Sequence, residues 1–423
     1  MIKDAINHEE RTPLFKYYKN MGGILKFGQE EQQQGSLFDE RIDGGYGWII
    51  TAGAFLCHFQ ATGVMQDYYE QHVFHNTHNV AVKLSFVGTL LVLVTYSFMI
   101  ISTFLESVLG LKVCLIIGSC FISTGMFLAG SATQIAMKIV PEWFDRKLNT
   151  AMGISVSSAA LGGFAFPFVM TYFNDLLGAT WALRCLSISF IAINIIVCSV
   201  IRKRRSPIQR KRIALDEIVR LGLLRNVNVI IWCAVGFFQV LSNYYYQTLT
   251  TNPTPCVLAY ATYIGLSPFQ GSAVISIASL ISVIGRIYAG YLADSIGNIN
   301  TCFIFMFMSG IASIVVWTLA RNYFSLLVFA SLFGFFGGVY NALQGPIAVK
   351  LFGLENYSAG YTLIMLLNCP AIFGPTIASA IESRSDGEPF LTYKLFYGLA
   401  SIISALIVLV LKFRIGQSLT AKV

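Results

Sequence analysis

Long apolar runs separated by short polar segments dominate the chain. Each run is near the ~20 residues that a helix needs to cross a ~30 Å hydrocarbon core. The runs lack the alternation of barrel strands, so helices are left as the structure that satisfies the backbone in lipid. The pattern predicts eleven membrane helices, at Trp48–Gln66, Leu84–Thr103, Val113–Ser131, Leu148–Tyr172, Trp181–Ile201, Val227–Tyr246, Phe269–Leu292, Cys302–Leu319, Phe324–Ala348, Tyr357–Ile381 and Leu395–Leu411.

Composition leads to the same class of protein. The 423 residues are 55% hydrophobic and 12% charged, and the mean hydropathy is +0.65. A soluble protein carries about twice that share of charged residues. The chain is therefore predicted to be an all-α polytopic membrane protein, with membrane lipid around it.

The formal net charge of +8 is concentrated in one basic block, Arg202–Arg212. Positive loops stay in the cytosol, so this block indicates a cytosolic linker rather than a nucleic-acid site. A patch for lipid headgroups is an alternative. The block divides the chain into a disordered cytosolic tail (1–42), an N-terminal bundle of five helices (43–201), a basic linker (202–226), a C-terminal bundle of six helices (227–413) and a cytosolic tail (414–423).

Three motifs resemble a known family. "DGGYGW" (Asp43–Trp48) and "WFDRKLNTAMGISVSSAALGG" (Trp143–Gly163) resemble the two signatures of the monocarboxylate transporter family, within the major facilitator superfamily. "GRIYAGYLADSIG" (Gly285–Gly297) resembles the superfamily's loop between helices eight and nine. "GVMQDYY" (Gly63–Tyr69) is more similar to the fungal permeases of the family than to the animal lactate carriers. The resemblance implies the major facilitator fold, with two helical bundles.

The first signature is expected to shape the start of a helix. Glycine adopts positive φ without strain, so Asp43, Gly44 and Gly45 are expected to form a tight turn at the cytosolic face. Tyr46 and Trp48 are expected to anchor that end at the headgroups. The resemblance implies that this motif, with Gly47, and Asp294 of the third motif serve conformational change.

One helix of the family is absent from the N-terminal half. Only Ser131–Ile139 separates the third run from the segment before the fifth family helix, and a nine-residue helix rises about 14 Å, too little to cross. Eleven helices also conflict with the positive-inside rule, because they place the N-terminus and the basic linker on opposite sides. We expect about a helix's length of sequence to be missing near Gln134–Met137; a rearranged eleven-helix variant is the alternative.

Arg286 lies inside an apolar run, where an arginine is by default a functional residue. The resemblance implies that it pairs with a substrate carboxylate. The same resemblance aligns the family's aspartate, one turn before this arginine, with Ser282. It aligns the family's helix-one lysine, which is linked to proton coupling, with Gln66. Neither replacement carries the family's charge, which points away from proton–lactate symport. Alternatively, Arg286 snorkels to the cytosolic face or bonds to Asp294.

Polar residues in three other runs are further candidates for binding a solute. Gln239, Asn243 and Tyr244 end the seventh family helix with hydrogen-bonding and stacking groups. Asn341 and Asn368 place amides at membrane depth, where they need partners on other helices or in a substrate.

No catalytic arrangement, metal motif or cofactor motif is visible, and the absence of a phosphate loop leaves ATP-driven transport unsupported. The chain is therefore predicted not to be an enzyme. We expect a secondary transporter of a small organic solute that works by alternating access, with or without a co-transported proton. The solute is monocarboxylate-like, or a non-monocarboxylate such as riboflavin, and the membrane is plasma or vacuolar. The alternative is a transport-inactive truncated isoform or a sensor with a transporter fold.

Overall fold

The computed structural model describes residues 43–60, 137–201, 220–251, 256–382, 384–385 and 388–416. Every regular element within these ranges is helical. The predicted runs Leu84–Thr103 and Val113–Ser131 lie outside the described residues, as do the tail 1–42, most of the basic linker and the Gln134–Ala136 part of the expected junction.

The N-terminal group of elements is formed by α3 (Tyr46–Gln60), the 3₁₀ turn η3 (Val140–Glu142), α8 (Leu148–Leu177) and α9 (Ala179–Val200). Residues of α3 at three- and four-residue spacing, Ile50, Ala54 and Cys57, join one buried cluster with Val156 of α8 and Val197 of α9. This spacing places them on one face of the helix, so α3 is held by a single apolar stripe.

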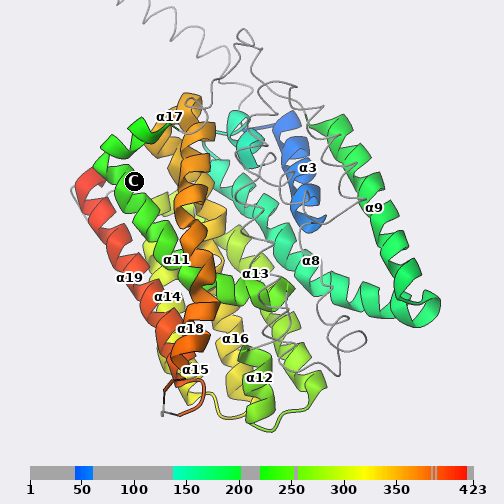
Figure 1. Ribbon diagram of the computed structural model, residues 1–423. Coiled ribbons are helices and arrows are strands. Elements are labelled where there is room, and N and C mark those ends of the chain that lie inside the picture. The colour runs from blue at the N-terminus through cyan, green and yellow to red at the C-terminus, as the bar shows by residue number, and fades with distance from the viewer. Residues whose placement is uncertain are drawn as a thin grey trace, which may run out of the picture. The chain divides into compact units, whose positions relative to one another are not determined.

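The C-terminal group is larger (Figure 1). It contains the 3₁₀ turn η4 (Leu221–Arg225), α11 (Val227–Thr251), α12 (Cys256–Tyr263), α13 (Pro268–Ile296), α14 (Asn298–Ile311), the π-helical turn η5 (Ala312–Val316), α15 (Trp317–Leu319), α16 (Tyr323–Gly337), α17 (Val339–Asn368), the 3₁₀ turn η6 (Cys369–Phe373), α18 (Gly374–Glu382) and α19 (Leu391–Gly416).

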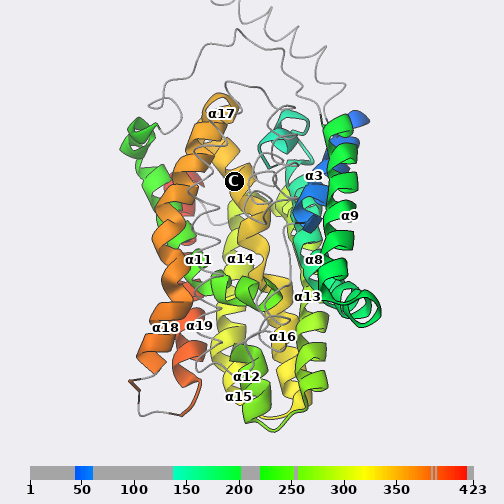
Figure 2. The same cartoon turned by 45° about the vertical axis from the view of Figure 1, so that its right-hand side comes forward.

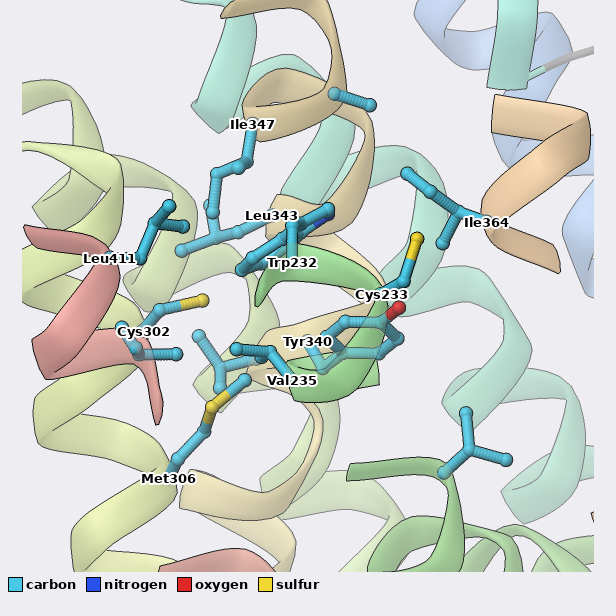
Figure 3. Packing of buried hydrophobic residues seen from close by; sticks show 14 of the residues in the cluster. Trp232, Cys233, Val235, Cys302, Met306, Tyr340, Leu343, Ile347, Ile364 and Leu411 are labelled. Carbon is cyan, nitrogen blue, oxygen red and sulfur yellow. The ribbon is translucent and has the colours of Figure 1, made fainter. Parts of the chain in front are cut away.

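The core of the C-terminal group is aromatic and aliphatic. Trp232 of α11 and Tyr340 of α17 lie with ring centroids 5.8 Å apart, and Cys302, Met306 and Leu411 from α14 and α19 complete the cluster (Figure 3). Aromatic pairs at this separation add to the stabilisation that comes from burial alone. The cluster joins α11, α13, α14, α17 and α19, which are distant in the sequence.

Four segments of the described residues are long and apolar enough to cross a membrane: Phe269–Ile296, Asn298–Leu319, Tyr323–Glu382 and Leu391–Ile415. Shorter apolar helices are Tyr46–Phe59, Ile188–Val200 and Val227–Ser242. The longest segment contains two of the predicted runs, Phe324–Ala348 and Tyr357–Ile381. The backbone break that separates them lies within α17, at Gly353 (φ 71°, ψ 162°).

The third motif is not a loop in this chain. Residues Gly285–Ile296 continue α13, and the break comes at Gly297, with φ 97° and ψ 152°. Apolar residues at helical spacing extend to Ile296, and glycine tolerates the conformation that follows. The motif is thus helical almost to its end, and the predicted helix, which stopped at Leu292, was four residues too short.

Candidate functional site

α8 and α13 cross at very short range, side by side in Figures 1 and 2. A Cβ atom on Gly153 would lie 2.6 Å from the carbonyl oxygen of Arg286, and one on Gly290 would lie 2.4 Å from that of Asn149. Neither contact fits a side chain, so glycine on each helix allows the two backbones to touch. The crossing joins the N-terminal group of helices to the C-terminal group.

Asp294 caps the beginning of α8 from the other helix. Its Oδ1 accepts from the backbone N–H of Asn149 at 3.3 Å and from Nδ2 of the same residue at 2.8 Å. Its Oδ2 accepts from the backbone N–H of Thr150 at 3.0 Å and from the Thr150 hydroxyl. The first N–H groups of a helix have no partner within it and attract negative charge, so this carboxylate is matched to its site.

Arg286 lies two turns before Asp294 on the same side of α13, with Gly290 between them. It is 4% exposed, and its Nη1 donates to the carbonyl oxygen of Val156 on α8 at 2.9 Å. A Cβ on Gly338 would lie 2.7 Å from Nε, so the stem of Arg286 lies against that glycine. The guanidinium is thus inside the protein and held against α8, which excludes the snorkelling alternative. The Asp294 carboxylate accepts its described hydrogen bonds from Asn149 and Thr150, both on α8.

Ser282, at the position of the family's aspartate, is fully buried one turn before Arg286. Ser279, about one turn before Ser282, is also buried. Neither hydroxyl has a hydrogen-bond partner among the described residues. Buried polar groups are nearly always bonded, so such groups call for a water or a ligand as partner. The face of α13 that bears Arg286 is therefore polar, without a second charge at 282.

A second polar group gathers between α11 and α17. Asn368 is fully buried, and its Nδ2 donates to the Tyr340 hydroxyl at 3.1 Å. A Cβ on Gly236 would lie 2.4 Å from that hydroxyl and 2.5 Å from Nδ2, so a glycine of α11 makes room for both. Gln239 follows one turn along α11 and is also fully buried, and neither its Oε1 nor its Nε2 has a hydrogen-bond partner among the described residues.

The structure brings some of the predicted site residues together. Gln239 and Asn368 belong to the group between α11 and α17, and Asn341 is half-buried next to Tyr340. Asn243 and Tyr244 belong to α11, but their side chains lie outside the described part of the structure. Gln66 lies outside the described residues altogether.

The two family-like signatures pack against each other. Tyr46 lies 5.3 Å from Trp143 between ring centroids, and Trp48 lies 5.0 Å from Phe144. The Tyr46 hydroxyl donates to the carbonyl oxygen of Val200 at 2.6 Å. These half-buried rings therefore pack within the N-terminal group, and the expected role of Tyr46 and Trp48 as headgroup anchors stays a prediction.

Backbone angles of the first signature agree in part with the expected turn. Asp43 has φ 69° and Gly45 has φ 55°, while Gly44 does not have a positive φ. Aspartate is one of the few residues other than glycine that adopt this region. A Cβ on Gly47 would lie 3.1 Å from the ring of Phe144, so its small size serves packing.

His58 is a buried titratable residue that the sequence reasoning missed. It lies in α3, is 8% exposed, and its Nδ1 is 2.9 Å from the carbonyl oxygen of Ala54. The one signal available in the sequence was a histidine inside an apolar run, two turns before the Gln66 position that the family comparison singled out.

Within the described ranges, no group of three or more metal-ligating side chains comes together.

These features describe a helical membrane protein in which, among the described residues, α8 and α13 bring two groups of helices close together beside a buried cation. The family model of the Major Facilitator Superfamily matches residues 80–375 and 250–420. The chain belongs to the Major Facilitator Superfamily, whose members are transporters and not enzymes.

Relatives with similar sequences are fungal transporters. An MFS-type transporter of Gibberella moniliformis is 25% identical over 370 residues, which cover 82% of this chain and 86% of the relative. The fujikurins efflux protein of Gibberella fujikuroi is 24% identical over 398 residues, covering 87% and 83%. The probable transporter MCH2 of Saccharomyces cerevisiae is 24% identical over 395 residues, covering 86% and 82%.

Solved structures share the fold at low sequence identity. The human organic anion transporter MFSD10 superposes with a TM-score of 0.62 at 11% identity, covering 86% of this chain and 98% of that one. The E. coli fucose:proton symporter FucP gives a TM-score of 0.60 at 10% identity, with the same coverage. The predicted major facilitator fold is confirmed.

Proposed function

We propose that the chain transports a small organic anion by alternating access and that Arg286 binds the carboxylate of that anion. The observation that carries the proposal is the place of Arg286, buried at the crossing of α8 and α13 where the two groups of helices meet. A guanidinium presents its donors in a planar fork that matches a carboxylate, and burial strengthens the interaction. Nη1 donates to the carbonyl oxygen of Val156, which fixes the orientation of the fork.

The rest of the solute meets neutral hydrogen-bonding groups in this proposal. Gln239 and Asn368 supply amide groups, and Asn368 is oriented by Tyr340. Such groups suit a hydroxyl or keto oxygen, so small hydroxy and keto acids fit better than plain fatty acids. Asn243, Tyr244 and Asn341 remain candidates for the same wall, and Gln66 for the facing one.

Alternating access requires the crossing to open and close. Asp294 and the first turn of α8 form a contact that must break when the two groups of helices separate at that end. We assign Asp294 to conformational change for this reason, together with the signature residues Asp43 to Trp48. The membrane is the plasma or the vacuolar membrane, which fluorescence of a tagged chain distinguishes.

The test is uptake of labelled L-lactate, pyruvate and riboflavin by proteoliposomes that contain the full chain, with protein-free vesicles as the background. We expect exchange of lactate or pyruvate in the wild type and loss of at least about tenfold in Arg286→Ala, the equivalent of about 1.4 kcal/mol. Arg286→Lys keeps the charge but not the fork, and we expect an intermediate rate.

Two outcomes would change the proposal. If only riboflavin moves and Arg286→Ala has no effect on it, the solute is neutral and the proposed carboxylate site is wrong. If nothing moves through a chain that is folded by its thermal unfolding curve, the inactive isoform or sensor becomes the better description. Since one relative is named an efflux protein, export from loaded vesicles belongs in the same assay.

A further inference from the structure

We infer that two exposed arginines at one end of α11 and α19, Arg225 and Arg414, bind the headgroup of an anionic phospholipid whose acyl chain lies along α19. Such a site is independent of the transported solute and goes beyond the proposed function. It lies outside the basic block Arg202–Arg212, on residues that the structure describes.

A contact between α11 and α19 brings the two arginines to the same corner. Arg414 lies in the last turn of α19, and its Nε donates to Oδ1 of Asn228 on α11 at 3.3 Å. Asn228 follows Arg225, the last residue of η4, by three positions, so their Cα atoms are at most about 11 Å apart. Both arginines are exposed. A phosphate beside Asn228 is therefore within reach of both long side chains.

The turn η4 is fixed to the rest of the C-terminal group on two sides. Leu223 packs against the buried cluster of this group, while Leu221 is 65% exposed. Arg220, which precedes the turn, donates from Nη1 to Oδ1 of Asn356 on α17 at 2.6 Å. Arg225 is therefore presented by a packed element, with an apolar side chain open to the surroundings in the same turn.

Charge at this corner is positive. The elements η4, α11 and α19 contain Arg225, Lys394, Lys412 and Arg414, and no Asp or Glu in their described lengths. Lys394 lies in the first turn of α19, at its other end, and Lys412 is 5% exposed. The two exposed arginines thus share the corner without an acid on their own elements. A guanidinium presents a fork of donors that matches the oxygens of a phosphate.

An exposed apolar stripe on α19 leads to Arg414. It consists of residues at three- and four-position spacing that are 39–53% exposed, namely Leu399, Ile403, Leu406, Val410 and Phe413. Residues at this spacing share one face of a helix. The stripe rises about 21 Å, more than half of a ~30 Å hydrocarbon core, so it accommodates the acyl chain of a lipid in one leaflet.

The two surfaces together select the occupant. A nucleic acid or an acidic peptide would use the arginines and leave the stripe without a partner, whereas a neutral phospholipid would use the stripe and not the charge. An anionic phospholipid uses both. Anionic lipids are enriched in the cytosolic leaflet, and this end of α11 is expected to face the cytosol because the basic linker leads into it.

The test measures which lipid the purified full chain retains. Wild-type protein in detergent is mixed with equal amounts of phosphatidylserine and phosphatidylcholine that carry the same acyl chains, and the bound lipid is counted by native mass spectrometry. We expect phosphatidylserine to be preferred by about fivefold for each arginine, or about 25-fold in total. The double variant Arg225→Gln/Arg414→Gln should retain the two lipids equally.

The matched control is the double variant Arg321→Gln/Arg384→Gln. These two arginines are also exposed, but they lie at the opposite end of the helices, after α15 and after α18. We expect this variant to keep the full preference for phosphatidylserine. Insertion is complete before purification, so retention reports binding rather than the effect of positive charge on topology.

Several outcomes would overturn the site. One is equal retention of both lipids by the wild type, and another is an unchanged preference in Arg225→Gln/Arg414→Gln. If glycerophosphoserine, the headgroup without chains, displaces phosphatidylserine at equal concentration, the site takes a soluble anion instead. If polyglutamate displaces the lipid in the same way, the occupant is an acidic peptide.

A second measurement needs no variant and covers the case in which the double variant does not fold. Phosphatidylserine with a photoreactive group on its acyl chain should label α19 and α11 of the wild type in vesicles, and unlabelled phosphatidylserine should block this labelling better than phosphatidylcholine. Labelling spread evenly over all helices would contradict the inference. Neither measurement involves uptake, so failure of the proposed transport leaves the lipid site standing, and failure of the lipid site leaves the proposed transport standing.

Discussion

The amide of Gln239 is buried without a hydrogen bond among the described residues, a costly state for a single side chain. An unsatisfied buried amide destabilises a fold by about 1–3 kcal/mol. Methionine has a similar length and no polar hydrogen. We expect Gln239→Met to raise the temperature of thermal unfolding and, at the same time, to slow lactate exchange, because the group serves the solute rather than the fold.

Gln270 provides the matched control. Its Oε1 accepts from the Ser267 N–H at 3.0 Å and closes the capping box at the beginning of α13. Gln270→Met should lower the unfolding temperature slightly and leave exchange unchanged. Equal effects of the two substitutions would show that Gln239 has no special relation to the solute.

Tyr260 shows a residue whose polar atom serves the fold. Its hydroxyl donates to the Ala320 carbonyl oxygen at 2.6 Å, and Lys394 Nζ lies 4.3 Å from the ring centroid. Burial raises the pKa of the phenol, so the hydroxyl keeps its proton throughout the physiological range. Tyr260→Phe should destabilise the chain by about 1–3 kcal/mol, measured by thermal unfolding, without changing the rate of lactate exchange.

Sequence reasoning reached some residues and missed others for a physical reason. Arg286 was found because a charge inside an apolar run is rare in any membrane helix. Its acceptor, the Val156 carbonyl oxygen, lies 130 positions earlier, and no local pattern predicts that contact. His58 was missed because a lone histidine in an apolar run has no distinctive spacing.

At the scale of elements, hydrophobic length predicted where helices are but not where they end. The predicted Phe269–Leu292 became Pro268–Ile296, since the capping box at Ser267 starts the helix and Gly297 ends it. The predicted Tyr357–Ile381 is interrupted by the 3₁₀ turn of η6, which begins at Cys369 with Pro370 next. Hydropathy carries no information about such interruptions, because the residues inside them are apolar too.

The glycine crossing of α8 and α13 gives an element-scale prediction. A Cβ on Gly290 would meet backbone atoms of Asn149, which cannot rotate away. Gly290→Ala should therefore push the helices apart and destabilise the chain by about 1–3 kcal/mol, seen as a lower unfolding temperature.

Gly222 of η4 serves as the comparison, because nothing lies within 4 Å of a Cβ built there. Gly222→Ala should leave the unfolding temperature unchanged or raise it slightly, since alanine loses less backbone entropy on folding. Similar losses at both positions would contradict the close crossing.

At the scale of the whole molecule, the proposed function makes Asp294 a residue that sets the balance between closed and open forms. Asparagine offers one acceptor where aspartate offers two, so Asp294→Asn leaves an N–H of Thr150 facing an amide group. We expect the crossing to open more often. In a Ser282→Cys background, the buried thiol on the face of α13 that bears Arg286 should then react faster with a maleimide, by about tenfold for each 1.4 kcal/mol lost.

Glu355→Gln, an exposed acid in α17, should leave that labelling rate unchanged. A rate that rises equally in both variants would mean that surface charge, rather than the cap on α8, controls the opening.

The N-terminal half gives a prediction about the gene. If a helix is missing, a transcript that spans the codons of Gln134–Met137 contains about a helix's length of additional coding sequence. A transcript that reads through as the present sequence, with a product that exchanges lactate, would favour the eleven-helix variant. The all-helical membrane fold itself was predictable from the long apolar runs and the composition, whereas the pairing of α8 with α13 was not, because neither helix bears a mark of its partner.

The cap that Asp294 supplies also orders events during synthesis. Thr150 leaves the ribosome 144 residues before the carboxylate that binds its N–H. Until α13 is made, the first turn of α8 must use water or lipid headgroups instead. The first half therefore enters the membrane before the N–H groups at the start of α8 have their carboxylate acceptor, which the second half supplies. The two halves thus depend on each other for assembly.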